Sequence, residues 1–84
     1  MRDSNTFFVY VLKSLFHNWY YVGLSTNLDR RLKQHNKGET SSTKAYKPFS
    51  LVYSKPFPDR ISARDHEKFL KVRSNKEKLI QSLN

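Results

Sequence analysis

The segment TFFVYVLK, residues 6–13, constrains the fold of this chain more than any other. It consists almost entirely of aromatic, β-branched and other apolar residues, which favour strands. Successive side chains of a strand point to opposite faces, so a segment with this composition is apolar on both faces. Such a strand has to be covered on both sides. We therefore predict that residues 6–13 form the central strand of a sheet.

Two other segments are predicted to form strands. WYYVGL, residues 19–24, follows the first segment after a short turn, which favours an antiparallel hairpin. FSLVYS, residues 49–54, alternates apolar and polar side chains, as expected for a strand with one exposed face. The prolines of KPFPD, residues 55–59, are expected to end this third strand.

The first helix is predicted from its capping residues. Thr26 or Asn27 can accept a hydrogen bond from the first turn of a helix over about 27–36. Gly38 is expected to end this helix. The polar segment that follows, residues 37–48, has no periodicity and is expected to be a loop.

Two further helices are predicted after the third strand. One is expected over about 62–73, beginning at Ser62. The sequence SNKE, residues 74–77, matches a capping box, in which Ser74 opens a last helix that ends near Leu83. The predicted order is β-β-α-β-α-α. We expect a single α+β domain over residues 1–84, with a small three-stranded antiparallel sheet covered by helices.

Helical periodicity separates two neighbouring arginines of the first helix. Leu28 and Leu32 mark its buried stripe, and Arg31 and His35 lie beside them at about 100° per residue. Arg30 falls on the opposite, solvated side. A cation at the edge of an apolar stripe needs an anionic partner. Arg31 can find one in a ligand or in a buried acid, or its stem can extend to solvent.

The second helix repeats this arrangement with an acid. Ala63 and Leu70 mark its buried stripe, and Glu67 lies beside them, whereas Asp65 points away. His66 is expected to be a half-buried packing residue. An ion pair between Glu67 and Arg31 would explain both residues without any catalytic role.

The charge of the chain points to an anionic partner. Sixteen Lys and Arg residues against seven Asp and Glu give a net charge of +9, which is most often associated with nucleic acid binding. The absence of cysteine excludes disulfides, thiolate metal sites and Cys nucleophiles, and is consistent with a cytoplasmic protein. No apolar run approaches the ~20 residues of a membrane helix, so no membrane contact is expected.

Four short motifs together resemble the GIY-YIG nuclease domain. They are VYV at 9–11, YVG at 21–23, RLKQH at 31–35 and the glutamate of ARDHEKFLK at 63–71. The resemblance covers nearly the whole chain. It is greatest to the small stand-alone members, which are related to the catalytic domain of the nucleotide excision repair incision subunit. The first motif departs from the family pattern, because VYV stands where the family has GIY. The polar residue that larger members carry near the end of the second helix has only Asn75 as a nearby counterpart, and Asn36 is another accessory candidate.

The resemblance implies a metal-dependent endonuclease that hydrolyses DNA phosphodiester bonds, in DNA repair or recombination. Glu67 is expected to bind one Mg²⁺ or Mn²⁺ ion, and Arg31 to contact the scissile phosphate. Tyr10 is expected to act on the attacking water, and Tyr21 to orient water or phosphate. His35 is expected to hold or deprotonate a tyrosine. Which tyrosine is the general base stays open, because the reference pKa of tyrosine is about 10.

The loop over 37–48 is a candidate for binding the nucleic acid backbone. Lys37, Lys44 and Lys47 are expected to contact phosphates, and Ser42 and Thr43 to donate hydrogen bonds to them. The alternative is a solvated loop with no ligand.

Two other functions fit the same sequence. One is a non-catalytic nucleic-acid-binding module, for DNA or RNA, that retains the fold. Another is a small RNA-binding protein of the ribosomal type, which leaves the inward set of Arg31, His35 and Glu67 unexplained. A nuclease of this size is expected to be a monomer or weak dimer, and a protein partner that targets it is compatible with the sequence.

Overall fold

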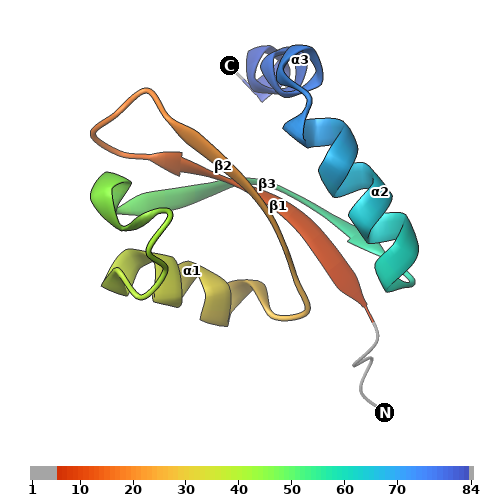
Figure 1. Cartoon of the computed structure of the whole chain (residues 1–84), viewed down its shortest axis with the longest axis horizontal. Helices are drawn as coiled ribbons and strands as arrows, with labels where there is room; N and C mark the ends of the chain where they lie inside the picture. Colours follow the sequence, from red (N-terminus) through yellow and green to blue (C-terminus); the bar gives the residue numbers. More distant parts are fainter. Residues whose placement is uncertain (1–5, 84) are drawn as a thin grey trace.

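The computed structural model describes residues 6–83 (Figure 1). Within them the elements are β1 (Phe7–Ser14), β2 (Tyr20–Ser25), α1 (Leu28–Lys37), the 3₁₀ turn η1 (Lys44–Tyr46), β3 (Phe49–Phe57), α2 (Arg60–Lys71) and α3 (Arg73–Leu83). These strands form a sheet in the order β2-β1-β3, with both pairs antiparallel. The predicted α+β class, the order of elements and the central place of the first strand are confirmed. No helix in this part of the chain is long and apolar enough to span a membrane.

One face of the sheet packs against α1. Tyr10, Leu12 and Phe49 form its buried centre, and Leu28 and Leu32 of α1 pack against them. The two leucines that marked the predicted buried stripe of this helix are therefore the residues that contact the sheet.

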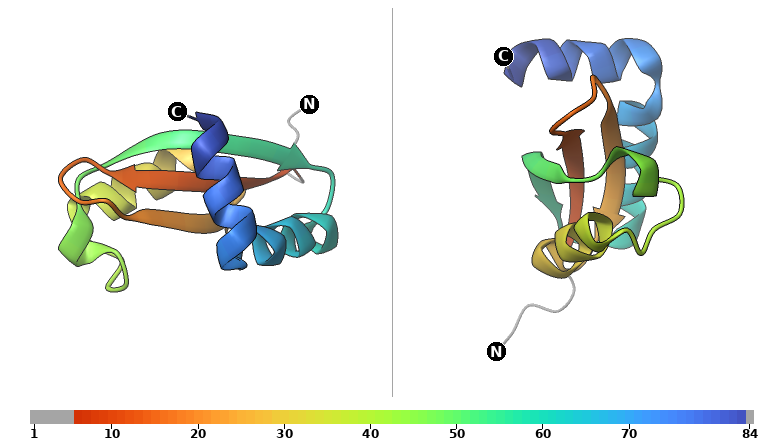
Figure 2. Two further views of the ribbon diagram at one scale, coloured as in Figure 1. Left: turned by 90° about the horizontal axis from the view of Figure 1, so that it is seen from above. Right: turned by 90° about the vertical axis from the view of Figure 1, so that its left-hand side faces the viewer.

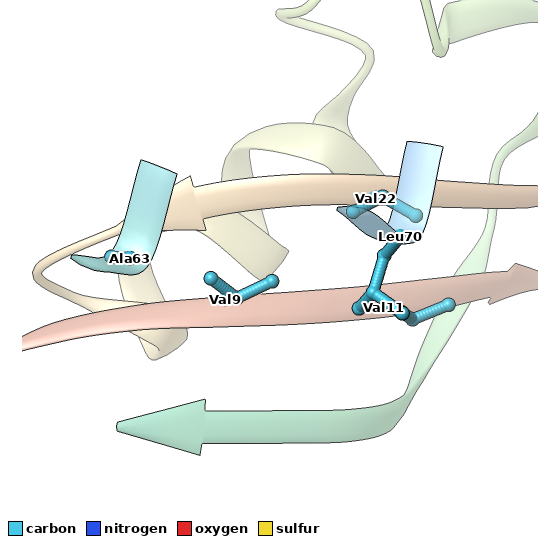
Figure 3. Close-up of a cluster of buried hydrophobic side chains, with 5 residues drawn as sticks. All are labelled: Val9, Val11, Val22, Ala63 and Leu70. Atoms are coloured by element: carbon cyan, nitrogen blue, oxygen red, sulfur yellow. The ribbon is translucent and has the colours of Figure 1, made fainter. Parts of the chain in front are cut away.

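The other face of the sheet packs against α2, so α1 and α2 cover opposite faces (Figures 1 and 2). Val9, Val11 and Val22 contribute from the strands, and Ala63 and Leu70 contribute from α2 (Figure 3). The alternation along β1 is complete, because its odd residues face α2 and its even residues face α1. This is why residues 6–13 had to be apolar on both faces.

The ends of α1 agree with the sequence. Asn27 is the N-cap, and its Oδ1 accepts a hydrogen bond from the Arg30 N–H at 3.1 Å. Gly38 ends the helix in the left-handed conformation, with φ of 79°.

The third strand is longer than predicted. β3 continues through Lys55 and Pro56 to Phe57, and Pro56 lies opposite Phe8 of β1. In the order β2-β1-β3 this strand pairs on one side alone, and an edge strand tolerates the missing N–H of a proline. The expectation that KPFPD ends the strand was wrong for this reason.

The predicted start of α2 was also wrong. The helix begins at Arg60, and Asp59 is its N-cap, with Oδ1 accepting from the Ser62 N–H at 2.8 Å. Ser62 lies in the first turn and donates its hydroxyl to the same carboxylate at 3.0 Å. Aspartate and serine are both good caps, so the pattern placed the boundary at the wrong one.

The other corrections concern α3 and the long loop. α3 begins at Arg73, one residue after the end cap of α2 at Val72, so Ser74 lies inside the helix and does not open it. The predicted loop over 37–48 contains η1.

Gly23 leaves room for the side chain of Tyr10, its partner on the neighbouring strand. Gly23 of β2 pairs with Tyr10 of β1, and the Tyr10 ring lies over it. A methyl group at position 23 would lie 2.5 Å from Tyr10 Oη and 2.9 Å from its Cε2, closer than real side chains approach. Tyr10 is 1% exposed, so its ring has little room to move away.

Replacing Gly23 with alanine is expected to destabilise the protein by about 1–3 kcal/mol, the usual cost of overpacking a core. Denaturant unfolding monitored by circular dichroism measures this change. The same substitution in a Tyr10→Leu background should have a much smaller effect, because the shorter side chain no longer crosses position 23. An equal effect in both backgrounds would contradict the account.

Candidate active site

A buried tyrosine and a buried histidine are hydrogen-bonded at the centre of the face covered by α1. Tyr10 Oη lies 3.1 Å from His35 Nε2. β1 positions the tyrosine and α1 positions the histidine, 25 residues later in the chain. His35 is fully buried, so its imidazole makes its hydrogen bonds to protein groups.

The hydrogen bonds around His35 determine which of its nitrogens carries the proton. Its Nδ1 lies 2.8 Å from Thr43 Oγ1, and Thr43 Oγ1 donates to the Thr40 carbonyl at 3.3 Å. A hydroxyl has one proton to donate, so Thr43 accepts from His35 Nδ1–H. His35 Nε2 is then unprotonated and accepts from the Tyr10 hydroxyl. The network thus assigns a directed chain from Tyr10 through His35 and Thr43 to a backbone carbonyl.

Burial keeps both members of this pair neutral. Desolvation raises the pKa of Tyr10 above 10.0, although the neighbouring Arg31 guanidinium acts in the opposite direction. Desolvation also lowers the pKa of His35 below 6.5, and the charge of Arg31 adds to that effect. Near pH 7 the pair is therefore a phenol and a neutral imidazole, so His35 can accept a proton from Tyr10.

Tyr21 joins the same cluster from β2. Its ring centroid lies 5.0 Å from that of His35 and 6.3 Å from that of Tyr10. Tyr21 is partly exposed, whereas the other two are buried. Tyr20 packs on the opposite face of the sheet, because successive side chains of a strand alternate between its faces.

Arg31 lies one turn before His35 on α1 and borders the pair. Its guanidinium is close enough to Tyr10 to form a hydrogen bond that lowers the pKa of the phenol. It also donates from Nη1 to Gln34 Oε1 at 2.8 Å. Arg31 is partly buried, while Arg30 is exposed, as the helical periodicity predicted.

Glu67 is a buried acid of α2, the helix that covers the other face of the sheet. It is 8% exposed, and its charge contributes to the raised pKa of Tyr10. Its carboxylate pairs with Lys71 Nζ at 3.2 Å and with Arg64 Nη1 at 3.9 Å. The ion pair with Arg31, considered from the sequence, is not among the salt bridges of residues 6–83. Lys71 and Arg64 lie four and three residues away on the same helix, so their spacing was a signal that sequence analysis passed over.

The donor set limits how a metal ion could be held. Residues 6–83 contain no group of three or more His, Asp or Glu side chains placed to bind one ion together. Mg²⁺ is commonly bound through one or two carboxylates, with waters and substrate phosphates completing its shell. Glu67 fits that mode as a single carboxylate ligand, provided that the ion competes with Lys71 and Arg64.

The predicted phosphate-binding loop separates into an exposed and a buried part. Lys37, Lys44, Lys47 and Ser42 are exposed. The lysines gather at the end of α1, because the side chains of Lys44 and Lys47 pack beside Gly38, with Cγ and Cε 3.6 Å and 3.2 Å from where its Cβ would be.

Thr43 is the exception in this loop. It is fully buried, with its hydroxyl bonded to His35 and Thr40, so it cannot also donate to a phosphate at the surface. That assignment needs correction: Thr43 is a positioning residue for His35. Sequence analysis missed this role because the contact depends on how the loop folds back over α1.

The accessory asparagines are structural. Asn36 Oδ1 accepts from the Phe49 N–H at 2.6 Å, which fixes the start of β3 against α1. Asn75 Nδ2 donates to the Phe69 carbonyl at 2.9 Å at the end of α2. His66 is half-buried as predicted, and its Nε2 lies 3.1 Å from Tyr53 Oη on the α2 side of the sheet.

Known proteins are similar to this chain over most of its length. The UPF0213 protein YazA of Bacillus subtilis is 31% identical over 77 residues, which cover 90% of this chain and 77% of YazA. A UPF0213 protein of Natronomonas pharaonis is 36% identical over 76 residues, covering 87% of this chain and 88% of the relative. The solution NMR structure of the UPF0213 protein BH0048 from Bacillus halodurans superposes with a TM-score of 0.56 at 33% identity, over 90% of this chain and 83% of that one.

The family model for the GIY-YIG catalytic domain matches residues 6–81, which cover β1 to α2 in full and all but the last two residues of α3. The four motifs that suggested the resemblance lie within that range. The chain therefore belongs to the GIY-YIG family of nuclease domains.

Proposed function

We propose that this protein is a divalent-metal-dependent endonuclease that hydrolyses phosphodiester bonds in DNA. The observation that carries the proposal is the buried Tyr10–His35 hydrogen bond, with neutral partners and with Arg31 and Glu67 beside it. A purely structural core has no need for this combination of a proton donor, an acceptor, a cation and an anion.

Hydrolysis of a phosphodiester requires that water loses a proton as it attacks phosphorus. Tyr10 donates its own proton to His35 Nε2, so its oxygen lone pairs remain free to accept a hydrogen bond from that water. As the new P–O bond forms, the water proton passes to Tyr10 Oη and the Tyr10 proton passes to His35 Nε2. The imidazolium that results is held through Nδ1–H by Thr43. This relay avoids a free phenolate, which the raised pKa of Tyr10 disfavours.

The remaining residues act on the phosphate. The guanidinium of Arg31 can donate two parallel hydrogen bonds to nonbridging oxygens, which compensates the charge that develops there. Tyr21 reaches solvent from the same cluster and is placed to orient the attacked phosphate or the water. The bond from phosphorus to the leaving nucleoside oxygen breaks, and that oxygen takes up a proton from solvent. The proton held by His35 then returns to Tyr10 as Tyr10 releases its own proton to solvent, which restores the pair.

Glu67 is the proposed metal ligand. A Mg²⁺ or Mn²⁺ ion bound there would lower the pKa of coordinated water and neutralise charge on the phosphate. Without a metal ion, Lys71 and Arg64 form ion pairs with this carboxylate and neutralise its charge.

The exposed lysines supply backbone affinity. Lys37, Lys44 and Lys47 lie at the end of α1, and Ser42 lies in the same exposed loop. With a net charge of +9, binding is expected to weaken steeply with added salt. We place this activity in the cytoplasm, on damaged or branched DNA in repair or recombination, with a monomer or weak dimer that a protein partner can direct to its substrate.

A non-catalytic nucleic-acid-binding module is the second candidate function. The observation that favours it is the pairing of Glu67 with two cations, which compete with any metal ion. Direct measurement of cleavage distinguishes the two functions.

Wild-type protein is expected to nick supercoiled DNA and to cut branched DNA at low salt with Mg²⁺. Glu67→Gln, Tyr10→Phe and Arg31→Ala should each lose at least about a hundredfold in rate, as when charge-stabilising or proton-transfer groups are removed elsewhere. Gel assays measure the rates, and filter binding checks that the variants still bind DNA.

The chain offers a matched control for each variant. Asp65→Asn changes an exposed acid of α2, Arg30→Ala an exposed arginine of α1, and Tyr53→Phe the tyrosine of the other Tyr–His pair. These controls should retain near wild-type rates. No cleavage by wild type, with DNA binding intact, would favour the binding module, and equal rates in all variants would remove these residues from the mechanism.

The pH dependence of cleavage follows from His35. Its pKa is lowered below 6.5 by burial, so it is neutral at pH 7 and becomes protonated as pH falls through the lowered value. Cleavage should therefore be independent of pH just above 6.5 and should decline only below it. Rates measured from pH 5 to 8.5 test this expectation. A decline that begins above pH 7 would show that His35 is already protonated when the account requires it neutral.

Folding stability should fall over the same range. In the unfolded chain His35 binds a proton near pH 6.5, whereas in the folded protein it does so only at lower pH. Its contribution to the free energy of unfolding is therefore fully present above pH 6.5 and is lost as the pH falls through the lowered pKa of the folded state. His66 has a lowered pKa as well, so His66→Asn should remove its part of the stability change without altering the pH dependence of cleavage.

A further inference from the structure

Two large apolar side chains are exposed at the turn between β1 and β2. Leu15 is 55% exposed and Phe16 is 77% exposed. Single exposed apolar residues are common on protein surfaces. These two are adjacent, however, and they project from the end of a hairpin rather than lying on a helix face.

The backbone of this turn is held firmly in place. Ser14 N–H donates to the Trp19 carbonyl at 3.0 Å, and Leu15 N–H donates to the Pro48 carbonyl at 2.9 Å. Ser14 Oγ donates to the Tyr46 carbonyl at 2.6 Å. The turn is therefore attached to the segment that leads into β3, and the exposed side chains are carried on an ordered support.

The surroundings of the turn are basic. Residues 13–19 and 40–48, which these hydrogen bonds join, contain Lys13, Lys44 and Lys47 and no acidic residue. The segments joined at the turn thus carry positive charge without negative charge, which favours a polyanionic partner.

A series of aromatic rings connects the turn to the candidate active site. The centroids of Tyr10 and Tyr21 are 6.3 Å apart, and Tyr21 stacks on Trp19 at 6.3 Å. Trp19 stacks on Tyr46 at 4.0 Å, and Tyr46 meets the edge of His17 at 5.5 Å. The series of rings therefore connects the site to His17, the residue that follows Phe16 in the turn.

We propose that Phe16, supported by Leu15, inserts between bases where the stack of the DNA substrate is already interrupted, as at a nick, a gap or a flap junction. The inference rests on the proposed function for the identity of the substrate, and it names the structural class of that substrate. Exposed apolar side chains that enter a base step beside basic residues are an established way of binding distorted DNA.

The preference for interrupted DNA follows from the size of the chain. Opening an intact base step costs free energy, and the cost is smallest where stacking is already lost. An 84-residue protein with one two-residue tip makes few contacts that could offset this cost. It therefore gains most from a site where Phe16 can stack without displacing paired bases. A protein or lipid partner for the same tip is less favoured, because neither explains the ring contacts that join it to the active site.

The experiment uses the full chain without divalent metal, so that no cleavage occurs. A fluorescent adenine analogue, 2-aminopurine, is placed beside a one-nucleotide gap and at the same position of an intact duplex. Wild type is compared with Phe16→Ala and with Ile61→Ala, a matched control that is also 77% exposed but lies at the start of α2. Thermal unfolding verifies that both variants are folded.

Wild type and Ile61→Ala should increase the fluorescence of the gapped duplex on binding and bind it more tightly than the intact one. Phe16→Ala should lose the fluorescence increase and at least about fivefold of that preference, the lower range for loss of one base–aromatic stack. An unchanged signal and preference in Phe16→Ala would overturn the inference. So would absence of binding to either duplex, or loss of binding to phospholipid vesicles by Phe16→Ala with DNA binding unaffected.

These outcomes are separate from those of the cleavage assay. A protein that unstacks the gapped duplex through Phe16 but never cleaves DNA keeps this inference and loses the nuclease proposal. If the protein cleaves DNA and Phe16→Ala changes neither the fluorescence nor the preference for gapped DNA, the nuclease proposal stands and this inference fails.

Discussion

The candidate site depends on the Tyr10 ring lying across Gly23. A buried tyrosine in a central strand needs a hydrogen-bond partner for its hydroxyl, and a neighbouring side chain on β2 would block its path. Glycine at position 23 leaves that path open, so the hydroxyl reaches His35 at 3.1 Å. The charges of Arg31 and Glu67 act on the pKa of this hydroxyl in opposite directions, although α1 and α2 cover opposite faces of the sheet.

Much of the fold could be predicted, because the sequence is locally consistent. The two-sided apolar pattern of residues 6–13 identified the central strand, and Asn27 and Gly38 marked the ends of α1. The errors arose where several residues could play one local role. Asp59 and Ser62 are both capable caps, and the side chain of Asp59 accepts two hydrogen bonds from Ser62. Pro56 was read as a strand breaker, because its tolerance depends on β3 being at the sheet edge.

The part of the candidate site that depends on spacing within a single helix or strand could be predicted. Helical spacing placed Arg31, His35 and Glu67 inward, whereas it is the pairing of the strands in the structure that places Tyr10 and Tyr21 on one face. The contacts between distant segments were not accessible from spacing. Thr43 is eight residues from His35, in a loop without periodicity, so its bond to Nδ1 became visible only when the loop was folded. That bond matters, because it determines the tautomer and with it the direction of proton transfer.

The second Tyr–His pair shows that such a hydrogen bond alone does not make an active site. Tyr53 and His66 are also 3.1 Å apart, and burial shifts their pKa values in the same directions as those of Tyr10 and His35. Besides burial, the charge of Lys55 acts on the pKa of His66, and neither an arginine nor a glutamate acts on this pair. The Tyr10–His35 pair differs in having Arg31 and Glu67 beside it.

The most direct test of the central claim is the protonation state of His35, measured by long-range ¹H–¹⁵N NMR of its imidazole ring. The account predicts a neutral ring at pH 7, with the proton on Nδ1 and a bare Nε2 whose resonance shifts in Tyr10→Phe but not in Tyr53→Phe. A proton on Nε2, or a ring protonated on both nitrogens at pH 7, would contradict the account, because His35 could not then accept the proton of Tyr10.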